Sequence, residues 1–135
     1  MDARAAVSRY KSEAIESAPP VKIVRLLYEG AMRFLDQAAQ IDPKTEGIRF
    51  REKLSRAQAI VTELRIALDH EQGSDVSLPL EQLYLFVEQQ ILRAWEDYAT
   101  DAITNAHQVL ATLHDAWRKV EIEPSPGTPP RKIED

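Results

Sequence analysis

Residues 22–41, KIVRLLYEGAMRFLDQAAQI, decide the fold class because their apolar side chains recur at steps of three and four. This spacing is typical of an α-helix with an apolar face. Two adjacent stripes run along it, one made by Ile23, Leu27, Gly30, Phe34, Ala38 and Ile41 and the other by Val24, Tyr28, Ala31 and Leu35. Pro19 and Pro20 precede the segment, where proline suits a helix start. Gly30 costs about 1 kcal/mol in helix propensity relative to alanine, so we expect it to permit close approach of another helix.

Three further segments repeat this periodicity, and together they predict an all-α protein, an antiparallel four-helix bundle. The second helix is expected from about residue 48 to 70, the third from Pro79 to about residue 98, and the fourth from Thr100 or Asp101 to about residue 120. The polar stretch EQGSDVS (71–77) is typical of a loop. We expect an N-terminal arm at 1–18, a bundle domain at 19–122, and a disordered, proline-rich tail at 123–135.

Length and composition narrow the function classes. A chain of 135 residues with 44% hydrophobic residues is expected to form one domain with its own core. The net charge of −5 provides no general attraction to nucleic acid. Cysteine is absent, and no apolar run is long enough to cross a membrane or to form the core of a signal peptide. The sequence therefore predicts a cytoplasmic protein without membrane insertion.

No arrangement of residues indicates catalysis. His107 and His114 lie two helical turns apart, too far to share a metal, and no Glu-x-x-His motif includes them or His70. Neither a glycine-rich phosphate loop nor a Ser/His/Asp set is recognisable. We therefore predict no catalytic residues, no metal, no cofactor and no enzyme activity.

A basic cluster in the second helix admits two interpretations. Its cations are Arg49, Arg51, Lys53 and Arg56, interrupted by Glu52. A solvated helix face is favoured over a nucleic-acid patch because the chain is acidic overall, and an acidic protein partner stays open.

The third helix carries more apolar residues than one buried face requires. A helix that is apolar nearly all round is either central in a bundle or reserves a face for a partner. We therefore predict a hydrophobic groove that accepts an amphipathic helix and is covered by the arm. The surplus is also compatible with a weak homodimer. The predicted client-binding residues are Val7, Tyr10, Leu64, Leu68, Leu83, Leu85, Phe86, Leu92 and Trp95.

Over residues 7–120 the chain resembles the flagellar secretion chaperones of the FliS family. The motifs occur in the family's order: Tyr10 in the arm, SAPPVKIVRLLYEGAMRFL at the first helix, ALDHEQGSD after the second, LPLEQLYLFVEQQILRAW at the third, and a tryptophan in the last. The motif positions with an expected structural role are Pro20, Leu27, Tyr28, Gly30, Ala31, Tyr84 and Trp117. The chain departs from the family at Pro19, usually serine, and at Leu85 and Trp95, both usually polar.

The resemblance implies a helical bundle with an N-terminal arm that binds the disordered C-terminal segment of flagellin, in a 1:1 complex. The client would become partly helical on the bundle surface, which would prevent premature polymerisation and keep it competent for flagellar type III secretion. The export gate and an anti-sigma factor are further partners that the family implies. The alternative is a helical adaptor or regulatory protein that binds a different partner helix.

Overall fold

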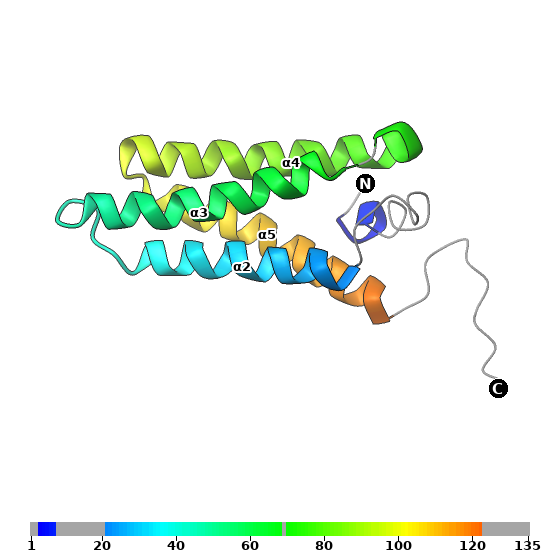
Figure 1. Cartoon of the computed structure of the whole chain (residues 1–135), viewed down its shortest axis with the longest axis horizontal. Coiled ribbons are helices and arrows are strands. Elements are labelled where there is room, and N and C mark those ends of the chain that lie inside the picture. Colours follow the sequence, from blue (N-terminus) through cyan, green and yellow to red (C-terminus); the bar gives the residue numbers. More distant parts are fainter. Residues whose placement is uncertain (1–2, 8–20, 69, 123–135) are drawn as a thin grey trace.

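The computed structural model describes residues 3–7, 21–68 and 70–122, and in this part of the chain all regular structure is helical. Four long helices form a bundle (Figure 1): α2 (Val21–Ala39), α3 (Gly47–Ile66), α4 (His70–Asp97) and α5 (Thr100–Ile122). The predicted fold class is therefore confirmed. The predicted tail at 123–135 and residues 8–18 of the predicted arm lie outside the described residues.

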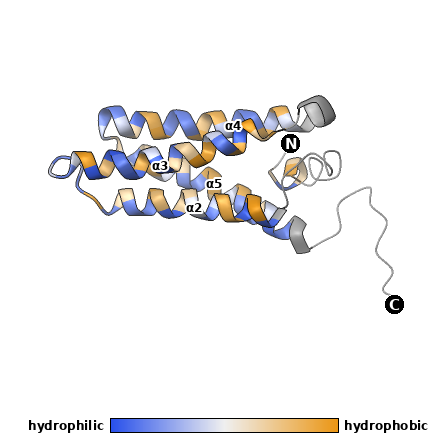
Figure 2. Cartoon of the chain, viewed as in Figure 1, coloured by the Kyte–Doolittle hydropathy of each residue, from blue (hydrophilic) through white to orange (hydrophobic). Residues whose placement is uncertain are grey.

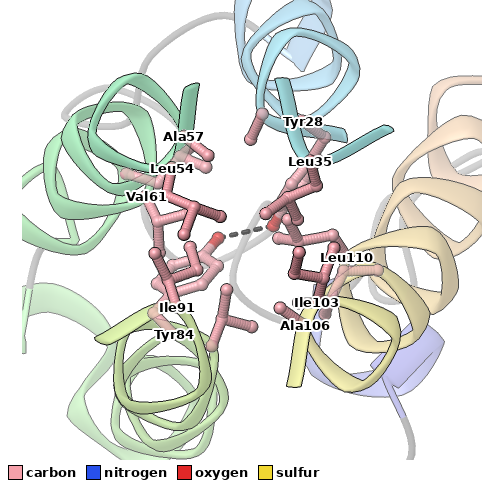
Figure 3. Packing of buried hydrophobic residues seen from close by; sticks show 14 of the residues in the cluster. Tyr28, Leu35, Leu54, Ala57, Val61, Tyr84, Ile91, Ile103, Ala106 and Leu110 are labelled. Atoms are coloured by element: carbon pink, nitrogen blue, oxygen red, sulfur yellow. Dashed lines mark hydrogen bonds between the residues drawn. The ribbon is translucent and has the colours of Figure 1, made fainter. Parts of the chain in front are cut away.

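The helices occupy the corners of a square, as the view along the bundle shows (Figure 3). Each helix packs against the next in the order α2, α3, α4, α5, and α5 closes the ring against α2. The connections are short, so consecutive helices run antiparallel. Consequently α2 faces α4 across one diagonal of the core, and α3 faces α5 across the other.

Of the two apolar stripes predicted for α2, the stripe that contains Tyr28 faces the centre of the core. Tyr28, Ala31 and Leu35 are fully buried, whereas Ile23 of the first stripe is exposed. Gly30 lies at the seam with α3, where an added Cβ would lie 3.3 Å from Ile60 Cδ1. That distance is tighter than most van der Waals contacts, which agrees with the predicted packing role of this glycine.

The predicted loop at 71–77 is wrong, because α4 begins at His70 and continues through Pro79. A proline inside a helix removes one backbone hydrogen bond, yet its fixed φ remains compatible with helical geometry. Ser77 and Leu80, on either side of Pro79, are fully buried. The helix is therefore packed into the bundle on both sides of Pro79. Helix α3 ends at Ile66, earlier than predicted.

An aromatic contact packs α3 against the connection between α4 and α5. Tyr98 adopts a positive φ of 55°, a conformation that residues other than Gly, Asn and Asp rarely adopt. Its ring packs edge-on against Phe50, with 5.8 Å between the ring centroids. An added Cβ at Gly47 would lie only 2.8 Å from the Tyr98 hydroxyl oxygen, so the first residue of α3 must be small. The aromatic packing compensates for the unfavourable backbone conformation.

Residues 3–7 form a short helical turn at the end of the bundle where α2 begins and α5 ends (Figure 1). Ala6 and Val7 are buried and belong to the same hydrophobic cluster as the bundle core. Ala3 lines a hollow of about 440 Å³ together with Leu83 of α4 and Leu113 of α5. This segment is therefore packed on the α4–α5 side of the bundle.

Candidate functional site

Aromatic residues from three of the sequence motifs meet in a hydrogen-bonded group inside the bundle. The hydroxyls of Tyr28 in α2 and Tyr84 in α4 are hydrogen-bonded across the diagonal of the core (Figure 3). Trp117 Nε1 in α5 donates to the Tyr28 hydroxyl oxygen at 2.7 Å. All three side chains are at least 98% buried. Three helices are thereby joined by polar groups that would be costly to bury without partners.

Between α3 and α4 lies an apolar groove with a volume of about 410 Å³, which we call the α3–α4 groove. One side is formed by α3, where the lining residues other than Leu54 are small or polar, and the other side by larger residues of α4. Its lining residues are Leu54, Ser55, Gln58, Ala59, Ile91, Leu92 and Trp95. The small side chains of α3 leave room for an inserted side chain or helix.

Along α4 the apolar surface extends beyond the α3–α4 groove. Leu78, Leu85 and Leu92 are 48%, 40% and 51% exposed. Because they are seven residues apart, they share one face of the helix. In Figure 2, hydrophobic residues alternate with hydrophilic ones along α4. An apolar stripe of this kind is the surface that an amphipathic helix recognises.

Two cross-helix contacts mark the ends of the α3–α4 groove. At one end Arg65 Nε donates to Glu88 Oε2 at 2.6 Å, which raises the pKa of the Arg65 guanidinium. At the other end Arg51 Nε donates to the carbonyl oxygen of Trp95 at 2.8 Å, and its guanidinium lies 4.4 Å from the centroid of the Trp95 ring. Arg51 and Arg65 are separated by about 21 Å along α3, and the α3 residues that line the groove lie between them.

The groove also contains a polar atom that the described part of the chain leaves unsatisfied. Gln58 Oε1 is buried and has no hydrogen-bond partner among the described residues, while Gln58 Nε2 donates to Glu88 Oε1 at 3.5 Å. A buried acceptor without a donor is costly.

The side chains that the sequence predicts for client binding do not form one surface. Leu92 and Trp95 line the α3–α4 groove, and Leu85 extends the same face. Leu83 lines the hollow on the α4–α5 side, and Phe86, three residues further, follows it on that side of α4. Helix α4 therefore carries apolar residues on both of its flanks.

The remaining predicted positions lie in the core, at its edge or outside the described residues. Leu64 is buried in the core, in line with Phe50 and Leu54, and Leu68 packs against the core. Val7 is fully buried. Of the motif positions, Ala31 is buried and Leu27 is partly buried. Tyr10 and Pro20 are not among the described residues.

Ser55, Gln58 and Ala59 are groove residues that the sequence reasoning missed. They follow Leu54 and Ala57 by one or two positions, so they lie on the neighbouring face of α3. Small and polar residues on an otherwise amphipathic helix look like ordinary surface. Only the spacing from the buried stripe would have pointed to them.

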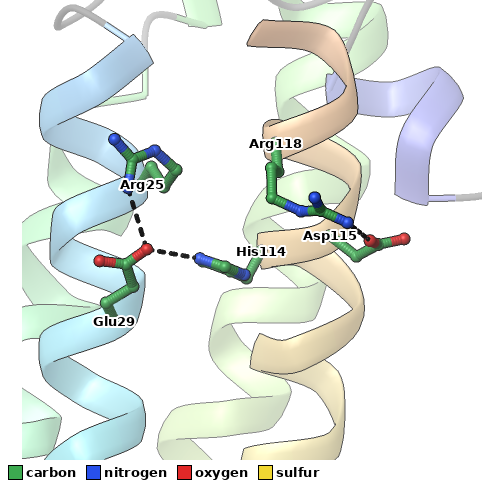
Figure 4. Close-up of polar contacts among 5 residues, drawn as sticks. All are labelled: Arg25, Glu29, His114, Asp115 and Arg118. Atoms are coloured by element: carbon green, nitrogen blue, oxygen red, sulfur yellow. Dashed lines mark hydrogen bonds and ion pairs between the residues drawn. The ribbon is translucent and has the colours of Figure 1, made fainter. Parts of the chain in front are cut away.

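Two histidines join α5 to α2 at the outer edge of the bundle. His114 Nε2 lies 2.8 Å from Glu29 Oε2, and Arg25 Nη1 donates to the same oxygen at 3.0 Å (Figure 4). His107 Nε2 lies 3.2 Å from Asp36 Oδ1. The two histidines are seven residues apart on α5, and their partners Glu29 and Asp36 are seven residues apart on α2 in the opposite order, as antiparallel packing requires. Because an ionised carboxylate only accepts, the Nε2 of His114 carries the hydrogen.

The hydrogen bond from His114, together with Arg25, lowers the pKa of the Glu29 carboxyl group. A lowered pKa in the folded state stabilises the fold above the unfolded pKa of about 4.3, and this contribution is lost as the pH falls through the folded pKa. We expect Glu29→Gln to lower the free energy of unfolding at pH 7 by only about 0.5 kcal/mol, since the carboxylate is partly exposed. The difference from the unsubstituted protein should shrink below about pH 4.

Urea unfolding at several pH values measures this difference. The matched control is Asp36→Asn, which removes the carboxylate of the more exposed His107–Asp36 pair. A difference that stays constant from pH 7 to about pH 3 would contradict the assigned contribution of Glu29.

Neither a metal site nor a membrane span is recognisable in the part of the chain that the structure describes. No three His, Cys, Asp or Glu side chains among these residues are grouped so as to hold a metal ion. None of the described helices is long and apolar enough to cross a membrane.

Comparisons with known proteins identify the class to which this bundle belongs. The family described as "Flagellar protein FliS" matches residues 3–124. A flagellar secretion chaperone FliS of Campylobacter jejuni is 32% identical over 85% of this chain and 90% of its own length. The proteins of the same name from Vibrio cholerae and Salmonella typhimurium are 28% and 27% identical, over 89% and 79% of this chain and 91% and 80% of their own lengths. The chain belongs to the FliS family.

Proposed function

We propose that this protein is a cytoplasmic export chaperone that binds the C-terminal segment of flagellin in the α3–α4 groove. Membership of a family whose relatives are named flagellar secretion chaperones supports the role. The single structural observation that carries the binding site is the apolar groove, bordered by exposed Leu92 and Trp95 and containing the unsatisfied Gln58 Oε1. Binding keeps the client from polymerising and competent for type III secretion.

The physical requirements of such a client match the groove. A disordered segment loses conformational entropy when it folds on binding, so it needs a large apolar contact area to compensate. The stripe Leu78, Leu85 and Leu92 extends over about 21 Å of α4, which is the length of a helix of about 14 residues. One client segment bound in the α3–α4 groove of each chain would give a 1:1 complex.

Calorimetric titration of the C-terminal peptide of the flagellin from the same genome tests this proposal. We expect one binding site per chain and a change in the fluorescence of Trp95, since the other tryptophan, Trp117, is buried. Trp95→Phe should abolish most of the fluorescence change and leave heat release in place. Absence of heat and of any fluorescence change would contradict the function and would favour the alternative, a helical adaptor for another partner helix.

We further propose that residues 1–18 form an arm that shields apolar surface of the bundle domain at 19–122. Ala6 and Val7 are buried against the bundle, and the α4–α5 hollow lies next to Ala3. Deletion of residues 1–18 is expected to expose Leu83 and Leu113 and therefore to increase the binding of a hydrophobic dye or self-association. Unchanged dye fluorescence together with unchanged sedimentation would contradict a shielding role.

Docking to an export gate or an anti-sigma factor rests on the resemblance alone. The apolar surface of α4 is equally the surface on which a weak homodimer would form. A bound peptide and a second copy of the chain would compete for this surface. Titration of the flagellin peptide at two protein concentrations therefore distinguishes client binding from homodimer formation.

A further inference from the structure

Charge is distributed unevenly over the bundle. Helices α2 and α3 carry eight Lys and Arg residues against four Asp and Glu. Helices α4 and α5 carry three against nine. Since α2 and α3 are neighbours in the ring, their basic excess lies on one side of a protein whose net charge is −5.

The seam between α2 and α3 concentrates cations that the described residues do not neutralise. Arg33, Lys53 and Arg56 have no carboxylate within 4 Å in the described part of the chain, and only Arg49 forms an ion pair, with Glu46 at 3.1 Å. Unpaired cations on an acidic protein raise the local electrostatic potential at this seam.

An aromatic ring lies among these cations. Lys53 Nζ is 6.0 Å and Arg56 Cζ is 5.7 Å from the centroid of the partly exposed Phe34 ring. The guanidinium of Arg33 lies over the same seam, 3.7 Å from the position that a Cβ of Gly30 would take. We call Arg33, Phe34, Arg49, Lys53 and Arg56 the basic face.

Next to the basic face is a hollow of about 370 Å³ that contains a second unsatisfied acceptor. Its lining residues are Gln37, Gln40, Ile41, Arg49 and Lys53. Gln37 Oε1 is buried and has no hydrogen-bond partner among the described residues. The hollow therefore adds polar and apolar side chains, among them Gln37 and Ile41, beside the cations of the basic face.

We propose that the basic face binds an acidic segment of a partner protein. Carboxylates of the segment would contact the three cations other than Arg49, and an apolar side chain would contact Phe34. The basic face lies on the opposite flank of α3 from the α3–α4 groove, so the two surfaces can be occupied at the same time. A long nucleic acid fits less well, because it would extend from this face toward the acidic helices α4 and α5.

The test uses a fluorescein-labelled peptide of about 16 residues, which spans about 24 Å as a helix. It consists of Glu with Leu at every third or fourth position. The tested variant is Arg33→Gln/Lys53→Gln/Arg56→Gln. The matched control, Arg93→Gln/Arg118→Gln/Lys119→Gln, removes the same number of exposed cations from α4 and α5. Glutamine retains helix propensity in both, and thermal melting checks that both remain folded.

We expect the tested variant to bind the acidic peptide about tenfold more weakly, with less dependence on salt, and the control to bind within about twofold of the unsubstituted protein. Equal losses in the two variants would overturn the proposal, since net charge alone would then explain binding. Equal binding of a peptide with Gln at every Glu position would overturn it as well. Equally tight binding of an oligothymidylate of the same length would assign the face to nucleic acid instead.

Discussion

Replacing Tyr28 by alanine is expected to lower the free energy of unfolding by about 3–5 kcal/mol, the usual cost of deleting a fully buried aromatic ring. The ring is fully buried, and its hydroxyl is hydrogen-bonded to both Tyr84 and Trp117. Domains of this size are stable by only about 5–15 kcal/mol. The variant should therefore unfold at a much lower urea concentration, or fail to accumulate in cells.

Tyr28→Phe isolates the contribution of the hydroxyl from that of the ring. It removes the oxygen that accepts from Trp117 Nε1, so we expect a loss of about 1–3 kcal/mol. A double-mutant cycle with Trp117→Phe should give a coupling energy of at least about 0.5 kcal/mol. The matched surface change, Leu92→Gln, should alter stability by no more than about 0.5 kcal/mol. Additive losses in the cycle would contradict a shared network.

The second large effect concerns binding. Trp95→Ala is expected to weaken the binding of the flagellin peptide by at least about 30-fold, or about 2 kcal/mol. Trp95 borders the α3–α4 groove and is held in place by Arg51, which stacks on the ring. Rigid, partly exposed aromatic side chains are the most frequent anchors of protein interfaces. Calorimetry on the folded variant measures the change.

Phe86→Ala is the matched control, because Phe86 is 40% exposed and Trp95 is 38% exposed on the same helix. Phe86 lies on the other flank of α4, so its removal should weaken the peptide by no more than about fivefold. The reverse order of effects would move the main binding site to the α4–α5 side. Equal and small effects would contradict both assignments.

The helical periodicity of the sequence predicts the all-α fold and most of the core correctly. Phe50, Leu54 and Val61 in α3, and Tyr84 and Ile91 in α4, are buried as the steps of three and four require. A helix has only one angular period, so a run of apolar residues at that period identifies its buried side. The start of α4 was predicted less well, because the glycine and serine residues before Pro79 are typical of loops.

The candidate site was predicted in part. The surplus of apolar residues in α4 predicts a binding surface. Four of the residues predicted for it are exposed on α4, namely Leu85, Phe86, Leu92 and Trp95. How they divide between two flanks depends on where α3 and α5 cover the helix. Apart from Leu54, the residues that α3 contributes to the groove are small or polar, and nothing in their identity distinguishes them from ordinary surface.

The sequence by itself therefore determined the helices, their buried faces and the family to which the chain belongs, because these depend on local spacing and on ordered motifs. Only the tertiary structure decided that Tyr28, Tyr84 and Trp117 share hydrogen bonds, that α3 and α4 enclose a groove, and that cations gather at the α2–α3 seam. Each of these features joins residues from different helices. Their positions follow from the order and rotation of the helices in the ring, which are set by the packing of the whole core rather than by any one segment.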